Sequence, residues 1–96
     1  MRLSNEQIAA LREVVRAIAG DDAEIVVFGS RLDNARHGGD LDLLIESDRP
    51  LGPLDRARIK IRLEDRLGLP VDVIVHTRGK PMTPFLRIAL ETGVAL

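Results

Sequence analysis

The sequence predicts an α+β fold, a small mixed β-sheet flanked by helices with its elements in the order α-β-β-α-β-α. Short β-branched runs alternate with longer segments whose apolar residues recur at helical spacing. Glycine and proline residues separate these segments, as expected of turns. The chain has 96 residues, of which 45% are hydrophobic, so residues 1–96 are expected to form a single domain around one core.

The first helix is expected over residues 4–19. It starts with the sequence SNEQ, in which Ser4 and Gln7 have the spacing of a capping box. Gly20 follows the last helical residue and is typical of a helix end. The apolar residues of the segment form one stripe: Ile8, Leu11, Val14, Val15 and Ile18.

Two strands are expected next. Residues 24–28 (EIVVF) are apolar on both faces, which predicts a buried strand that ends at Gly29. Residues 40–46 (DLDLLIE) form the second expected strand, which ends before Pro50. Residues 30–36, which lie between the two strands, fit one short helical turn.

A second long helix is expected over residues 54–67, where Gly68 and Pro70 stop it. The stretch RIKIRL within it alternates like a strand, but the length between breakers favours a helix. Its apolar residues lie on two sides, with Leu54, Ala57 and Ile61 on one and Ile59, Leu63 and Leu67 nearly opposite. One side can pack on the sheet, and the other needs a helix neighbour or another subunit.

The third strand is expected over residues 71–76 (VDVIVH). A last helix starts with Thr83 as its cap and Pro84 in the first turn, and it ends at Gly93. The long helix between the second and third strands predicts a parallel, right-handed crossover. If the first strand is antiparallel to the second, Gly29 lies at the same sheet edge as the starts of the other two strands.

Three aspartates lie at these strand starts. Asp40 and Asp42 point the same way, about 7 Å apart along the strand, and Asp72 lies near the start of the third strand. Carboxylates held together repel one another unless a cation neutralises them. Mg²⁺ prefers oxygen ligands, and two ions about 4 Å apart can clamp a phosphoryl displacement. The three residues are therefore the candidate catalytic and metal-binding residues for Mg²⁺, with two ions expected.

The Gly-Ser-Arg turn after the first strand is a candidate phosphate site. Gly29 lets the backbone approach a ligand closely, and amides at the start of a helical turn donate hydrogen bonds to anionic oxygen. The Ser30 hydroxyl can contact a terminal phosphate, and Arg31 can offset its charge. These three residues are the candidate nucleotide-binding residues.

Each candidate has a structural alternative. Asp40 and Asp42 also fit a solvated strand edge or turn cap, Asp72 an exposed strand start, and Arg31 a surface position.

Four further polar residues have no firm role. His37 fits an exposed loop, and no role is assigned to Asp33. Arg78 and Lys80 fit either a phosphate contact or a solvated turn. The charged segment DRARIKIRLEDR fits a solvated helix face with i,i+4 ion pairs rather than a nucleic-acid stripe.

Composition excludes several classes of function. The chain has no cysteine, which excludes disulfides, zinc–thiolate sites and thiol catalysis. Aromatic residues are only 2% of the chain and the net charge is −1, so direct nucleic-acid binding is not expected. No apolar run is long enough to span a membrane and the N-terminus does not read as a signal peptide, so a cytoplasmic location is expected by default.

The segment GSRLDNARHGGDLDLLI, followed by VDVIV, resembles the signature of the DNA polymerase β-like nucleotidyltransferase superfamily. The small size resembles its minimal nucleotidyltransferase (MNT) branch. The resemblance implies that Asp40 and Asp42 bind two Mg²⁺ ions, that Asp72 completes the site and helps deprotonate the acceptor hydroxyl, and that Gly29 and Ser30 bind nucleotide phosphate. It also implies transfer of AMP from ATP.

MNT proteins are encoded beside a helical HEPN partner, an RNase toxin that they neutralise by binding, by AMPylation of a tyrosine, or by both. The resemblance therefore implies an antitoxin that modifies a HEPN-like partner. Larger superfamily members use a second domain to hold base and acceptor, so a chain this small needs a partner to complete its pocket. Homo- and hetero-oligomers both remain open.

Two other functions are compatible with the sequence. The chain could act as a stoichiometric antitoxin with little turnover, or it could adenylylate a small molecule such as an aminoglycoside. The clustered carboxylates favour catalysis over binding alone, and the missing acceptor domain weakens the small-molecule alternative.

Overall fold

The computed structural model describes residues 3–29 and 40–96 of the chain. Its elements are α1 (Asn5–Ala19), β1 (Glu24–Phe28), β2 (Leu41–Ser47), α2 (Pro53–Leu67), β3 (Val71–Thr77), α3 (Pro84–Thr92) and β4 (Val94–Ala95). The expected order α-β-β-α-β-α is confirmed, with a short strand added after the last helix. The helical turn expected over residues 30–36 lies outside the described residues.

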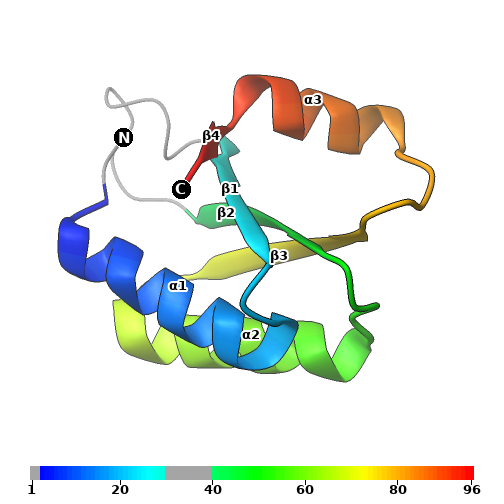
Figure 1. Cartoon of the computed structure of the whole chain (residues 1–96). Helices are drawn as coiled ribbons and strands as arrows, with labels where there is room; N and C mark the ends of the chain where they lie inside the picture. The colour runs from blue at the N-terminus through cyan, green and yellow to red at the C-terminus, as the bar shows by residue number, and fades with distance from the viewer. Residues whose placement is uncertain (1–2, 30–39) are drawn as a thin grey trace.

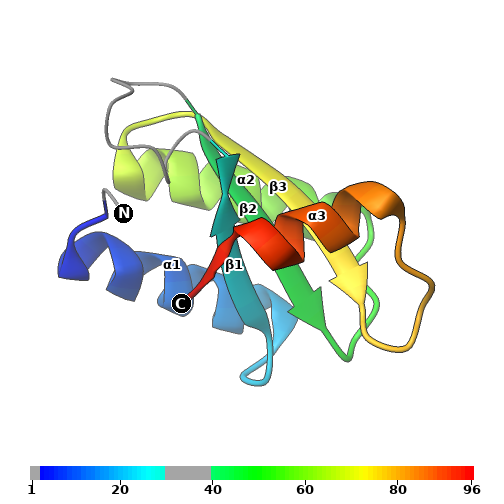
Figure 2. The same cartoon turned by 90° about the horizontal axis from the view of Figure 1, so that it is seen from above.

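The strands form one mixed sheet in the order β3-β2-β1-β4. β1 is antiparallel to both β2 and β4, whereas β2 and β3 are parallel, as the crossover through α2 requires. The helices lie on both faces of this sheet, α1 and α2 together on one and α3 on the other (Figures 1 and 2). The end of β1 therefore lies at the same edge as the starts of β2 and β3, as predicted.

The strands alternate between two apolar layers. The larger cluster, between the sheet and the α1–α2 pair, contains Leu11, Val14, Val15, Ala19, Ile25, Val27, Leu41, Leu43, Ile45, Ile59, Leu63, Val71 and Val73. The smaller cluster, under α3, contains Val26, Leu44, Leu86 and Ala89. Because side chains alternate along a strand, Asp42 shares the α3 face with Leu44, and Asp72 shares it with Ile74. The two aspartates therefore lie on the less covered face.

The helices begin where the sequence predicts. Ser4 and Gln7 form the reciprocal capping box of α1, and Thr83 accepts a hydrogen bond from the Leu86 backbone at the start of α3. On α2, Ile59 and Leu63 are buried against the sheet, so RIKIRL is helical. No helix within residues 3–29 and 40–96 is long and apolar enough to cross a membrane.

β4 is the element that the sequence does not predict. It is two residues long, too short for a periodic pattern, and Gly93 brings it against β1. A Cβ on Gly93 would lie 2.5 Å from Val26 Cγ1 and 2.9 Å from the Val27 carbonyl oxygen, which only glycine avoids. The Leu96 amide donates to the Ile25 carbonyl beyond it. The last residues of the chain thus add an edge strand next to α3.

Candidate active site

Asp42 and Asp72 face each other at one edge of the sheet. They are register partners in the parallel pair of β2 and β3, and both point to the α3 side. Partial burial raises the pKa of Asp42, and the charges of Asp72 and Asp40, together with a hydrogen bond to Asp72, raise it further. The carboxylates are therefore close enough to repel, as the topology predicts.

Gly29, directly after the end of β1, lies next to the Asp42 carboxylate of this pair. Its φ of +79° lies in the left-handed region, and a Cβ on it would lie 2.2 Å from Asp42 Oδ2. The close backbone approach expected of Gly29 is therefore present, and the neighbour it approaches is the Asp42 carboxylate. Ser30, Arg31, Asp33 and His37 lie outside the described residues.

Asp40 stands one residue outside the strand. β2 begins at Leu41, one residue later than the expected strand over residues 40–46. The Leu41 amide donates to the Pro70 carbonyl. Asp40 is exposed, and its charge reaches Asp42.

The side chains at the acidic edge determine which metal ion could bind there. Within residues 3–29 and 40–96, no three His, Asp or Glu side chains stand in an arrangement that could hold a metal ion. The Asp42–Asp72 pair is nevertheless a hard oxygen donor set, and Mg²⁺ typically takes one or two protein carboxylates and completes its shell with water and substrate phosphate. The pair fits such an ion.

Lys60 and Glu64 are near the acidic pair, and the sequence analysis did not single them out. Lys60 Nζ donates to the Val71 carbonyl at 2.6 Å, and the Val71 amide donates to Glu64 Oε2 at 2.9 Å. The two side chains also pair with each other at 3.1 Å, and the hydrogen bond from Val71 and the one from Lys60 lower the pKa of Glu64. Both backbone groups of the residue before Asp72 are thus held by one turn of α2.

Lys60 also brings positive charge to the site. Its Nζ lies 3.8 Å from Asp72 Oδ1, and both residues line a cavity of about 260 Å³. The cavity is also lined by Pro53, Arg56, Ala57 and Val73. The i,i+4 pair itself was visible in the sequence as part of a charged helix face. Its contact with β3 was not visible, because that contact forms only when the crossover folds.

Arg78 and Lys80 lie at the other end of β3. Arg78 donates to Glu24 at 2.8 Å and to Asp48 at 3.0 Å, and these bonds raise its pKa. It therefore ties the ends of three strands together and is neither a phosphate ligand at the acidic edge nor a simple solvated turn residue. Lys80 is exposed, and its carbonyl is 3.1 Å from His76 Nε2.

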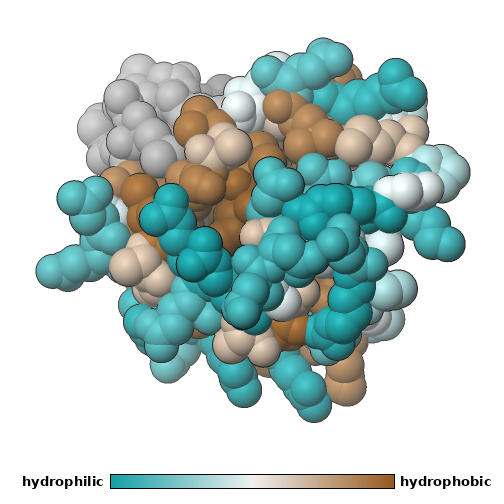
Figure 3. Space-filling view, in the orientation of Figure 1, coloured by the Kyte–Doolittle hydropathy of each residue, from teal (hydrophilic) through white to brown (hydrophobic). Residues whose placement is uncertain are grey.

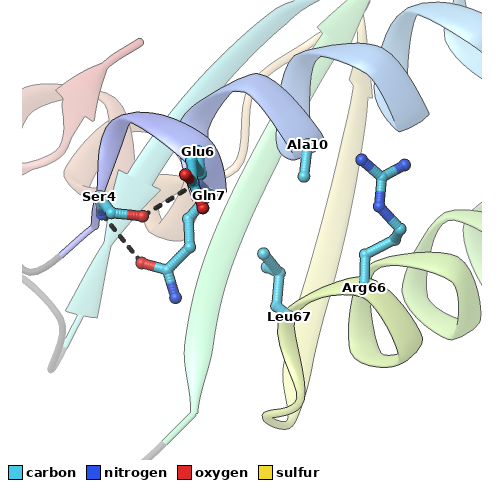
Figure 4. Close-up of a pocket in the computed structure, with 6 residues that line it drawn as sticks. All are labelled: Ser4, Glu6, Gln7, Ala10, Arg66 and Leu67. Carbon is cyan, nitrogen blue, oxygen red and sulfur yellow. Dashed lines mark hydrogen bonds between the residues drawn. The ribbon is translucent and has the colours of Figure 1, made fainter.

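A wider cavity of about 550 Å³ lies between the start of α1 and the end of α2, and none of the three aspartates is among its lining residues (Figure 4). Ser4 and Gln7 line it, and their polar atoms already bond to each other at 2.9 and 3.1 Å. Arg66 and Leu67 enter it from α2. These bonds cap a helix, so the candidate site remains the acidic edge.

The sequence and the fold both match known proteins. The sequence profile of the family described as "Nucleotidyltransferase domain" matches residues 8–95. Among solved structures, one named "Structure of putative minimal nucleotidyltransferase" has a TM-score of 0.66 and 34% sequence identity to this chain. The match covers 99% of this chain and 98% of that chain. None of the curated proteins matches the sequence. The order of helices and strands predicted from the sequence is that of a nucleotidyltransferase fold.

Proposed function

The chain belongs to the family of nucleotidyltransferase domains, and from this premise we propose that it transfers AMP from ATP to a partner protein in a Mg²⁺-dependent reaction. Nucleotidyl transfer is the activity that the family supports. The observation that carries the rest is the pairing of Asp42 with Asp72 beside Gly29, whose backbone touches the Asp42 carboxylate.

In the proposed mechanism, Asp42 and Asp72, with Asp40 beside them, hold the metal, while Gly29, Ser30 and Arg31 bind the phosphates of ATP. The bound Mg²⁺ ions supply neutralisation of the phosphate charge. Lys60, 3.8 Å from Asp72, adds positive charge to the same edge.

The transfer itself is an in-line displacement. The hydroxyl oxygen of the acceptor forms a bond to the α-phosphorus of ATP while the bond from that phosphorus to the bridging oxygen of the β-phosphate breaks. Pyrophosphate leaves with the electron pair of that bond. The hydroxyl proton passes to a carboxylate oxygen of Asp72, which acts as general base.

The proposed acceptor is a HEPN-like helical protein from a neighbouring gene, which the chain neutralises as an antitoxin. Support comes from α2, whose outer face (Leu54, Ala57 and Ile61) stays exposed. Leu54 is 59% exposed and Ile61 is 64% exposed, at the i, i+3, i+7 spacing that helix-in-groove docking uses.

Mass spectrometry of the partner tests this function. The chain is incubated with Mg²⁺, ATP and the protein encoded by the neighbouring gene, and the partner is examined for an added AMP. We expect one adduct, which chelation of Mg²⁺ with EDTA abolishes and which Asp42→Asn reduces by about 10²–10³-fold.

A second candidate, the stoichiometric antitoxin, is favoured by the exposure of Leu54 and Ile61, which offer an apolar docking surface whether or not transfer occurs. If Asp42→Asn neutralises the partner fully and no adduct forms with the unaltered chain, this second function replaces the first.

A further inference from the structure

An apolar groove lies beside the acidic edge, on the α3 face of the sheet. It has a volume of about 510 Å³ and is lined by Phe28, Gly29, Phe85, Ile88, Ala89 and Thr92. None of these six residues carries a charge. Phe85 is 50% exposed and Ile88 is 60% exposed, and apolar surface is visible over α3 (Figure 3). The groove therefore presents accessible apolar side chains to a ligand.

The groove holds all the aromatic side chains of the protein. The chain has two phenylalanines and no tryptophan or tyrosine, and both phenylalanines line this one groove. Phe28 and Phe85 meet edge to face, with ring centroids 5.9 Å apart and planes at 85°. Phe85 is half exposed, so this residue is accessible to a flat ligand. Stacking on aromatic side chains is how proteins bind nucleobases with little discrimination among them.

The groove is continuous with the acidic edge through two residues. Gly29 lines the groove and also lies against the Asp42 carboxylate. Phe28 is the register partner of Asp42 across β1 and β2, so both side chains rise from the same face of the sheet. A ligand that spans this junction meets oxygen donors for a metal–phosphate group at one end and uncharged aromatic surface at the other. A nucleoside triphosphate has this division.

We propose that the groove between the end of β1 and α3 binds the base of the nucleotide, with Phe85 and Phe28 as its stacking platform. This inference rests on the proposed function, because it places the base relative to phosphates held at the acidic edge. Apolar stacking predicts modest discrimination among bases, since each base offers a π face. It also means that this chain supplies its own base site and needs a partner only for the acceptor.

Binding measurements with and without the base test the proposal. The affinities of Mg–ATP and of Mg–tripolyphosphate, which has no base, are measured by calorimetry for the unaltered chain and for Phe85→Ala. We expect Phe85→Ala to weaken the binding of Mg–ATP about tenfold, which is the size of one lost stacking contact. The affinity for Mg–tripolyphosphate should change less than twofold. The control, Asn5→Ala, truncates an exposed uncharged side chain on α1, outside both proposed binding surfaces, and should change neither affinity.

A second variant, Ile88→Ser, alters the groove at a position that is 60% exposed. It should also weaken the binding of Mg–ATP and leave the binding of Mg–tripolyphosphate unchanged. Far-UV circular dichroism and thermal melting establish that each variant folds. The proposed base site is refuted if Phe85→Ala and Ile88→Ser weaken the binding of ATP and of tripolyphosphate equally, or weaken the binding of neither. It is also wrong if the variants only convert a dimer to a monomer in sedimentation, since a second copy would then occupy the groove. If the unaltered chain binds neither ligand, the proposed function and the base site fail together.

Discussion

Asp42 carries its charge at a position where that charge destabilises the fold. The residue is partly buried, and Asp72 and Asp40 lie close enough to raise its pKa. A carboxyl group with a higher pKa in the folded chain holds its proton more tightly there than in the unfolded chain. The free energy of unfolding therefore falls as the pH rises from the ordinary value of 3.8 through the higher folded pKa, and the loss persists at neutral pH.

Replacing this one charge should make the protein more stable and inactive. We expect Asp42→Asn to raise the Tm at pH 7 by a few degrees, since each kcal/mol of repulsion removed is worth about 4–8 °C in a domain of this size. The gain should shrink as the pH falls below the ordinary pKa of 3.8, where Asp42 is protonated in both states. Thermal melts of both proteins between pH 3 and 7, without Mg²⁺, check this expectation. A lower Tm for the variant at pH 7 would contradict the repulsion argument.

Residues of the site differ in how far the sequence reveals them. Asp40, Asp42 and Asp72 could be predicted as site residues because they lie at the starts of strands, where a carboxylate does not stabilise an apolar core. Lys60 could not be selected, because its contacts with Val71 and Asp72 exist only after the crossover has folded. The sequence pattern therefore reveals the aspartates, which are unexpected at strand starts. The tertiary fold determines which other side chains, such as Lys60, surround them.

At the scale of elements, α2 is joined to β3 by the residues that hold Val71. Lys60 and Glu64 bond to the carbonyl and the amide of Val71, so one turn of α2 fixes the backbone directly before Asp72. Since Asp72 is paired in register with Asp42, a shift of this backbone would separate the two carboxylates. Groups that orient metal ligands typically change metal affinity by 10–100-fold when they are lost.

We therefore expect Lys60→Met to raise the Mg²⁺ concentration for half-maximal AMP transfer about 10–100-fold. Lys60→Arg, which keeps a donor and a positive charge, should restore part of the affinity. The measurement is initial rate against Mg²⁺ concentration at saturating ATP. Lys80→Met, an exposed lysine at the opposite end of β3, is the control and should leave the Mg²⁺ requirement unchanged. Equal effects of the two methionine variants would refute a positioning role for Lys60.

For the whole molecule, the sequence predicts the order of elements and the parallel crossover because both follow from local patterns and chain handedness. β4 escapes prediction because two residues have no period, and it is held by a tertiary contact at Gly93. The two sides of α2 are predicted correctly as different surfaces. Ile59 and Leu63 pack inward, while Leu54 and Ile61 remain exposed.

This division of α2 allows partner binding and catalysis to be separated. Leu54 and Ile61 of the α2 outer face do not line the cavity that Asp72 shares with α2, whereas Ala57 does. Ile61 is therefore the residue at which docking can be tested apart from the acidic edge. Ile61→Glu places a charge in the middle of the proposed docking surface, where loss of an interface anchor of about 2 kcal/mol weakens binding roughly 30-fold. Binding of Mg–ATP should be unchanged, because no atom of the acidic edge is altered.

Calorimetric titration with the partner from the neighbouring gene measures this effect. Ala9→Glu, which places the same new charge at an exposed position on α1, should leave partner affinity within twofold of the unaltered chain. Asp42→Asn should also keep full partner affinity while transfer is lost. If Ile61→Glu binds the partner as tightly as Ala9→Glu does, the partner docks elsewhere. The exposed apolar residues of α2 would then need another explanation, such as contact between copies of this chain, which sedimentation of the unaltered protein would detect.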